Sequence, residues 1–143
     1  MVKRMVVGFA FTENRKGVVL IRKNRPAWQA GRLNGVGGHI EQSEHPRDAM
    51  SREFEEETGI HVRGGRWERV VMLEGAGWHV TFFRCVLTTH DLHFMKSMTD
   101  EEVVVVGCEQ PTDLIENLTW LIPLCLDMSG VQVPIGLRDV GAN

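Results

Sequence analysis

Short apolar runs rich in β-branched residues alternate with polar turns through much of the chain. Residues 5–11 and 18–21 form two such runs, and the polar residues 12–17 separate them. Apolar runs of about four to eight residues bounded by turn residues are typical of strands, so these two predict a β-hairpin. Three later runs predict further strands over residues 67–73, 79–87 and 102–108.

A glycine-rich segment follows the predicted hairpin. Residues 22–32 are polar and irregular, with Pro26 and Gly31 as breakers, and residues 33–38 have the sequence LNGVGG. Because glycine lacks a side chain and tolerates sharp backbone turns, we expect either a tight loop or a distorted strand in this segment.

Two stretches have the spacing of a helix. In the first, residues 45–58, Met50 and Phe54 lie four residues apart; Ser43 is placed to cap the helix and Gly59 to end it. The second is predicted over residues 112–126. Its apolar stripe consists of Leu114, Leu118, Leu121, Ile122 and Cys125. Strands and helices in this order predict an α/β fold whose sheet is covered on both faces.

Composition narrows the class of protein. A chain of 143 residues fits one domain, residues 1–143, and its net charge of −3 provides no broad basic surface for duplex nucleic acid. The sequence contains no run of about 18 apolar residues, so no membrane-spanning helix is predicted. The three cysteines are an odd number without CxxC spacing, which favours a reducing compartment. We therefore expect a cytoplasmic protein, either a monomer or a homodimer.

Four carboxylates crowd into five residues of the first predicted helix. Helix residues three and four apart share a face, so Glu53, Glu56 and Glu57 project toward one region, where their charges repel. One interpretation is a solvated charged face, and the other is a site for a hard divalent cation such as Mg²⁺ or Mn²⁺. Such a cation commonly takes phosphate oxygens from its substrate, so the second interpretation predicts a phosphorylated ligand.

The spacing around these carboxylates favours the cation site. Seven residues at fixed intervals reproduce the Nudix box, and the chain therefore resembles the Nudix hydrolases. The matching positions are Gly38, Glu44, Arg52, Glu53, Glu56, Glu57 and Gly59. The resemblance implies the α/β/α sandwich of that family, with a mixed β-sheet, over nearly the whole chain.

The resemblance also implies the chemistry, which is hydrolysis of a nucleoside diphosphate linked to another group. Glu56 and Glu57 match metal ligands of the box, and Glu53 matches the position that serves as ligand or general base. Arg52 matches the residue that orients these carboxylates, and Gly37 would contribute its backbone carbonyl to the metal.

The family often places its general base outside the box. Residues 100–102 are acidic and directly precede the last predicted strand, and Glu101 is our candidate within them. The alternative interpretation of this run is a charged turn before a strand.

Two segments suggest how a substrate is bound. Residues 31–38 resemble a segment of the mammalian oxidised-purine triphosphatases, in which the residue equivalent to Asn34 contacts the base. Residues 116–124 resemble the base-facing helix of MutT-like enzymes, with Glu116 or Asn117 placed to read a purine edge. Lys23 is a candidate contact for a terminal phosphate.

Simpler interpretations of these residues remain open. Asn34 can serve only to form a turn, a lone lysine such as Lys23 is usually solvated, and Trp120 is expected in the core.

The sequence thus predicts an Mg²⁺-dependent or Mn²⁺-dependent hydrolase of MutT type. It would convert nucleoside triphosphates to monophosphates and pyrophosphate, with modified purine nucleotides as the favoured subset. The alternatives are a hydrolase of nucleotide sugars or other diphosphate-linked metabolites, and a non-catalytic nucleotide-sensing module. The intact box favours an enzyme acting on a small-molecule nucleotide.

Overall fold

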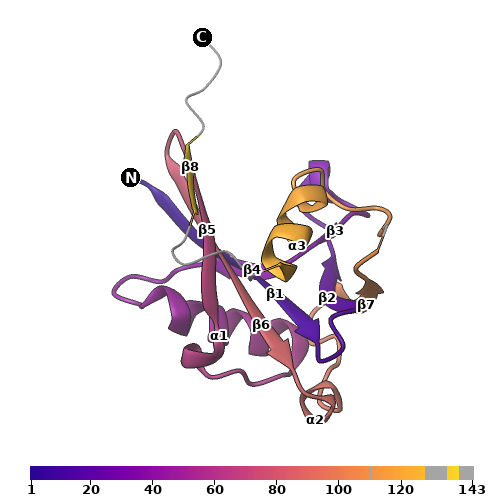
Figure 1. The fold of residues 1–143 in the computed structure, drawn as a ribbon. Helices are drawn as coiled ribbons and strands as arrows, with labels where there is room; N and C mark the ends of the chain where they lie inside the picture. The colour runs from indigo at the N-terminus through magenta and orange to yellow at the C-terminus, as the bar shows by residue number, and fades with distance from the viewer. Residues whose placement is uncertain (110, 128–134, 139–143) are drawn as a thin grey trace.

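A computed structural model describes residues 1–109, 111–127 and 135–138, which form an eight-stranded sheet flanked by helices (Figure 1). The strands are β1 (Lys3–Thr12), β2 (Gly17–Arg22), β3 (Leu33–Asn34), β4 (Val36–His39), β5 (Glu68–Gly75), β6 (Trp78–Leu87), β7 (Glu102–Gly107) and β8 (Ile135–Arg138). The α-helices are α1 (Pro46–Thr58), α2 (Thr89–Leu92) and α3 (Leu118–Leu126), and the 3-10 turns are η1 (Ala27–Gln29) and η2 (Gly64–Arg66).

The sheet is mixed, as expected. Its strand order is β3-β2-β1-β6-β5-β8, with β4 paired to β1 and β7 paired to β2. The central strand β1 runs antiparallel to β2 and β4 but parallel to β6 along its whole length. The predicted hairpin of β1 and β2 is therefore confirmed.

Both faces of the sheet are covered, because β1 sends alternate side chains to two separate cores. Val6 and Ala10 belong to the core beneath α1, which also contains Met50 of that helix. Phe9 and Phe11 belong to the other core, into which α3 packs its buried residues. The two helices thus form the outer layers of an α/β/α sandwich, which confirms the expected fold class.

The first helix has the predicted end but a different cap. Gly59 ends α1 in the left-handed conformation, with φ of 77°, and its N–H donates to the Glu55 carbonyl. The expected cap, Ser43, was wrong: it lies in a left-handed turn with φ of 65°, two residues too early. His45 caps the helix instead, because its Nδ1 accepts a hydrogen bond from the Arg47 N–H at 3.2 Å.

The second helix begins at Leu118, so the prediction of a helix from residue 112 was wrong. The preceding segment pairs with β3, where the Leu33 N–H donates to the Asp113 carbonyl at 2.7 Å. The Ile115 N–H donates to the Leu33 carbonyl at 3.1 Å, and a parallel bridge joins Leu33 to Leu114. These backbone groups bond to a distant strand and so do not form a helical turn.

The glycine-rich segment forms two short strands, β3 and β4, that Gly35 separates. A Cβ at Gly35 would lie 2.6 Å from Cγ1 of Val7, so the backbone needs glycine to approach β1. The sequence did not predict β8, which pairs in parallel with β5. No helix within the described residues is long and apolar enough to cross a membrane.

Candidate active site

Helix α1 and strand β4 form one side of the site, and two glycines allow them to meet closely. A Cβ at Gly38 would lie 2.4 Å from Cδ of Glu53, so the β4 backbone packs directly against the Glu53 carboxylate. A Cβ at Gly37 would lie 1.9 Å from the Val6 carbonyl oxygen. A side chain at either position would push β4 away from the helix or from β1.

Arg52 connects the loop before α1 to the acidic face of the helix. Its Nε and Nη2 donate to the two carboxylate oxygens of Glu44 at 2.8 and 2.9 Å, while Nη1 donates to Glu53 at 2.9 Å. Nη2 also donates to the backbone carbonyl of His39 at 3.0 Å. The hydrogen bonds with Glu44 raise the pKa of Arg52, which therefore stays charged and orients the carboxylates around it.

The three candidate metal-ligating carboxylates have different surroundings. Glu56 is exposed and lies 3.4 Å from Nη1 of Arg52, whereas Glu53 is mostly buried and burial raises its pKa. Glu57 is the least satisfied of the three, because its Oε2 is buried without a hydrogen-bond partner.

Burial also raises the pKa of Glu57, to about 7. The charge of Lys23 opposes this effect, while Glu53, Glu101 and Glu56 add to it. A buried carboxylate without a partner, surrounded by others of the same sign, is a group that a bound cation stabilises.

The donor set therefore fits a divalent cation in charge and chemistry. Within the described parts of the chain, however, no three acidic, histidine or cysteine side chains already converge on one point. Arg52 holds both Glu53 and Glu56, so these carboxylates would have to turn from the guanidinium to share an ion with Glu57.

Lys23 and Glu101 meet beside Glu57. Lys23 Nζ lies 3.0 Å from Oε1 of Glu101, and the backbone N–H of Asn24 donates to its Oε2 at 2.6 Å. Burial raises the pKa of Glu101, which is only 5% exposed, but the hydrogen bonds from the backbone of Asn24 and Arg25 and from Lys23, together with the Lys23 charge, lower the pKa overall. Lys23, the candidate contact for a terminal phosphate, is paired with Glu101 in this arrangement.

Asn34 and Asn117, the two candidate base contacts, lie on segments that come together away from the acidic cluster. Asn34 Nδ2 donates to Gln29 Oε1 at 3.0 Å, and its Oδ1 accepts from the Gly35 N–H at 2.7 Å. Asn117 precedes α3 without capping it through its side chain. The bridge between Leu33 and Leu114 places the segment that leads to Asn117 beside β3.

One expectation for these segments was wrong. Trp120 is 40% exposed on α3 and does not lie in the core. Sequence reasoning also missed Gln29 and Asn24, because both lie in the irregular stretch before β3. Their hydrogen-bond partners, Asn34 and Glu101, are apparent only in the fold.

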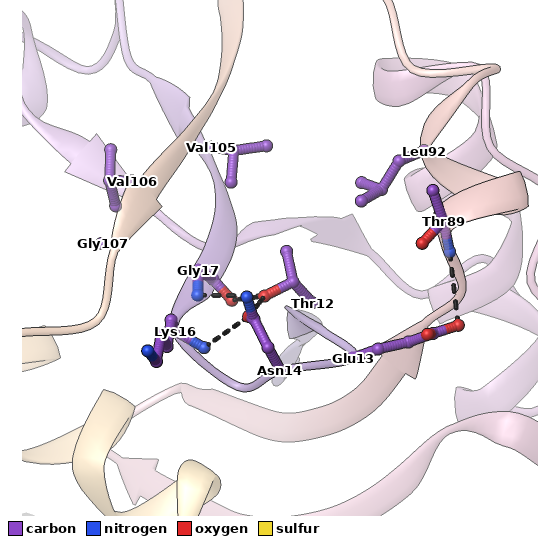
Figure 2. A pocket seen from close by; sticks show the side chains of 10 residues that line it. All are labelled: Thr12, Glu13, Asn14, Lys16, Gly17, Thr89, Leu92, Val105, Val106 and Gly107. Carbon is purple, nitrogen blue, oxygen red and sulfur yellow. Dashed lines mark hydrogen bonds between the residues drawn. The ribbon is translucent and has the colours of Figure 1, made fainter.

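A hollow of about 520 Å³ lies away from these residues, between the β1–β2 turn, α2 and β7 (Figure 2). In it the Thr89 N–H donates to Glu13 Oε1 at 3.3 Å, and the Gly17 N–H donates to Thr12 Oγ1 at 3.0 Å. No residue of the acidic helix face lines this hollow, so it is separate from the candidate active site.

Comparison with known proteins finds a matching family and a relative. A family model described as the NUDIX domain matches residues 2–120. A protein of Escherichia coli (strain K12) named CTP pyrophosphohydrolase is 31% identical in an alignment of 110 positions that covers 71% of this chain and 81% of that protein.

Solved structures share the fold. A NUDIX hydrolase from Nitrosomonas europaea has a TM-score of 0.72 and 19% identity, covering 96% of this chain and 80% of its own. A MutT NUDIX hydrolase from Burkholderia pseudomallei has a TM-score of 0.70 and 16% identity, covering 87% and 98%. A MutT structure from work on Aliivibrio salmonicida and Vibrio cholerae has a TM-score of 0.64 and 20% identity, covering 76% and 82%.

Proposed function

Because this chain belongs to the Nudix family and is a hydrolase of pyrophosphate bonds, we propose that it converts nucleoside triphosphates to monophosphates and pyrophosphate. The single observation that supports this proposal most is the buried, unpartnered Oε2 of Glu57 beside Glu53, Glu101 and Lys23. We further propose that residues 1–143 act as one domain on a small-molecule nucleotide.

Nudix hydrolases generally use divalent metals, and we assign Mg²⁺ or Mn²⁺ to the acidic face of α1. Its proposed ligands are Glu53, Glu56, Glu57 and the backbone carbonyl of Gly37. The ion, when bound, neutralises charge that develops on the diphosphate and acidifies a water molecule. The unpartnered Glu57 oxygen and its raised pKa support this assignment, because both reflect negative charge without compensation.

The chain's own residues orient and deprotonate the reactants. Arg52 holds Glu44 and Glu53 through hydrogen bonds of 2.8 to 2.9 Å, and in the proposal it fixes the carboxylates for ligation. Glu101 is the proposed general base, which accepts the proton of the attacking water. Its present hydrogen bonds from Lys23 and Asn24 would have to loosen for it to accept that proton.

Substrate binding is assigned to three residues. Lys23 lies beside the acidic cluster. In the proposal its ammonium group releases the Glu101 carboxylate and binds a terminal phosphate instead. Asn34 and Asn117 are proposed to contact the base, since the pairing of Leu33 with Leu114 brings their segments together. Gln29 would support Asn34, whose Nδ2 it already binds.

Two substrate classes have separate support. Modified purine triphosphates are one candidate, because residues 31–38 resemble a segment of the oxidised-purine triphosphatases. CTP is the second candidate, because the relative at 31% identity is named CTP pyrophosphohydrolase.

The test is release of pyrophosphate with Mg²⁺ from canonical and oxidised nucleoside triphosphates, with ADP-ribose and nucleotide sugars for comparison. Glu57→Gln should abolish turnover. Glu55→Gln is the matched control on the same helix, because Glu55 is exposed and, among the described residues, its side chain pairs with His61 alone, across 3.5 Å. Turnover confined to ADP-ribose or sugars would overturn the triphosphate assignment, and nucleotide binding without any turnover would indicate a sensing module.

A further inference from the structure

The segment that connects α2 to β7 ends at Glu101, the proposed general base (Figure 1). Its backbone binds the end of α1. The Lys96 N–H donates to the Thr58 carbonyl at 2.9 Å, and the Met98 N–H donates to the Glu57 carbonyl at 3.3 Å. The last carbonyls of a helix have no partner within the helix, so this segment supplies donors that α1 lacks. The segment is therefore fixed to the helix that carries the acidic face.

Two hydroxyl side chains hold the end of this segment. Thr99 Oγ1 accepts a hydrogen bond from the Glu101 N–H at 3.1 Å, and Ser97 Oγ accepts one from the Val103 N–H at 2.9 Å. A threonine that binds the N–H two residues ahead closes a tight local turn. Thr99 thus holds the backbone of Glu101 itself, whereas Ser97 acts on the strand that follows.

The turn directs one carboxylate into the protein. Thr99 and Asp100 are exposed, but Glu101 is buried and its carboxylate binds Lys23 Nζ and the Asn24 N–H. Asn24 also holds the turn from outside, because its Nδ2 donates to the Asp100 carbonyl at 2.8 Å. The position of the Glu101 carboxylate therefore depends on the backbone turn that precedes it.

We propose that Thr99 is a positioning residue for Glu101, whose backbone it holds in the turn that directs the carboxylate toward Lys23 and Asn24. This inference rests on the proposed function, in which Glu101 accepts the proton of the attacking water. Among the described residues the Thr99 hydroxyl makes no other hydrogen bond, so its effect on the reaction passes through Glu101. Misplacement of a reacting group by about 1 Å can slow a reaction by about a hundredfold.

Amide hydrogen exchange in the protein without substrate tests the positioning directly. The Asn24 N–H reports where the Glu101 carboxylate lies, because that carboxylate accepts its hydrogen bond. Thr99→Val removes the hydroxyl and keeps the shape of the side chain. We expect it to make the Asn24 amide exchange about fivefold faster or more, the factor for loss of one ordinary hydrogen bond. Thr99→Ser keeps the hydroxyl and should retain slow exchange.

Two controls accompany the exchange measurement. The Gly31 N–H donates to the Lys23 carbonyl at 2.8 Å, and its exchange should not change in Thr99→Val. Thr89→Val should change neither amide, because Thr89 is exposed on α2 and its hydroxyl makes no hydrogen bond among the described residues. Unchanged exchange at Asn24 in Thr99→Val would overturn the inference. Equally faster exchange at Gly31 would also overturn it, because the whole loop after β2 would then have opened.

Kinetics measure what the positioning contributes to the reaction. With a nucleoside triphosphate, Thr99→Val should lower kcat by about tenfold or more and change KM little, and Thr99→Ser should restore most of the rate. In a Glu101→Gln background Thr99→Val should have no further effect, because the group that it positions has been removed. A loss of equal size in that background would overturn the inference, since Thr99 would then act on something other than Glu101.

Failure of the proposed function gives a different result. If the parent protein hydrolyses no nucleoside triphosphate, the proposed function fails, whereas exchange at Asn24 still decides whether Thr99 positions the Glu101 carboxylate. If the parent is active and kcat is unchanged in Thr99→Val, the proposed function stands and the role of Thr99 is overturned.

Discussion

Gly38 presents its bare backbone to the carboxylate of Glu53, which would lie 2.4 to 2.5 Å from a Cβ at that position. We therefore expect Gly38→Ala to displace the Glu53 side chain and to lower the affinity for Mg²⁺ and kcat together, each by roughly tenfold or more. Mg²⁺ titration followed by activity measures both effects.

Gly65→Ala is the matched control for this change. A Cβ at Gly65 would meet no atom within 4 Å, so the same added methyl group should leave metal affinity and kcat unchanged. Equal effects of the two substitutions would show that the contact between Gly38 and Glu53 does not shape the site.

The raised pKa of Glu57 predicts how stability depends on pH in protein stripped of metal. Its folded-state pKa of about 7 exceeds the ordinary value of 4.5, so folding favours the protonated form. The stability from this group is fully present below about pH 4.5 and is lost as the pH rises through about 7. The loss is at most about 3 kcal/mol, at about 1.4 kcal/mol per pKa unit.

Thermal unfolding at pH 5 and pH 8, with EDTA or with Mg²⁺, measures this dependence. At pH 8 without metal, Glu57→Gln should melt at a higher temperature than the parent protein, because it removes the buried charge. Mg²⁺ should raise the melting temperature of the parent and have little effect on the variant. A pH dependence that is the same in both proteins would contradict the assignment to Glu57.

Glu101→Gln tests the proposed general base. We expect kcat to fall by about a hundredfold or more, which is the range for loss of a positioned base. In the parent protein the lowered pKa keeps Glu101 ionised, so this residue should cause no fall in rate until the pH is below about 4.5. Rates of pyrophosphate release across the pH range measure both effects.

Asp100→Asn is the control for that substitution, because Asp100 is the adjacent carboxylate and forms an exposed ion pair with Arg25. It should change kcat little. A similarly small effect of Glu101→Gln would mean that Glu101 only holds Lys23, and another group would then have to accept the proton.

The sequence predicted those features that depend on local spacing. The position of α1 followed from Met50 and Phe54 on one face and from Gly59 at its end, all within a few turns of chain. The acidic face followed from the same helical period. The central hairpin could be predicted in the same way, because β1 and β2 are neighbours in the chain and the turn between them is polar.

Features that depend on long-range pairing were not predicted. The helical spacing of residues 112–117 was overridden because Leu33 binds the backbone of Asp113 and Ile115, some 80 residues further along the chain. The pairing of Lys23 with Glu101 and of Gln29 with Asn34 likewise requires the fold. The sequence identified Lys23, Glu101 and Asn34 as candidates but not the partner of any of them.

The loop between β2 and β3 is closed at its base, where the Lys23 N–H donates to the Arg32 carbonyl and the Gly31 N–H donates to the Lys23 carbonyl. In the proposed function this closure would limit the size of substrate that the site accepts. The backbone hydrogen bonds of the loop set the spacing between Lys23, at its base, and Gln29, at its tip. In the proposed function, this fixed spacing would suit one length of polyphosphate between the terminal phosphate and the base. Insertion or deletion of a single residue within the loop would shift one end against the other, so that a nucleotide could engage the lysine or the base contacts but not both.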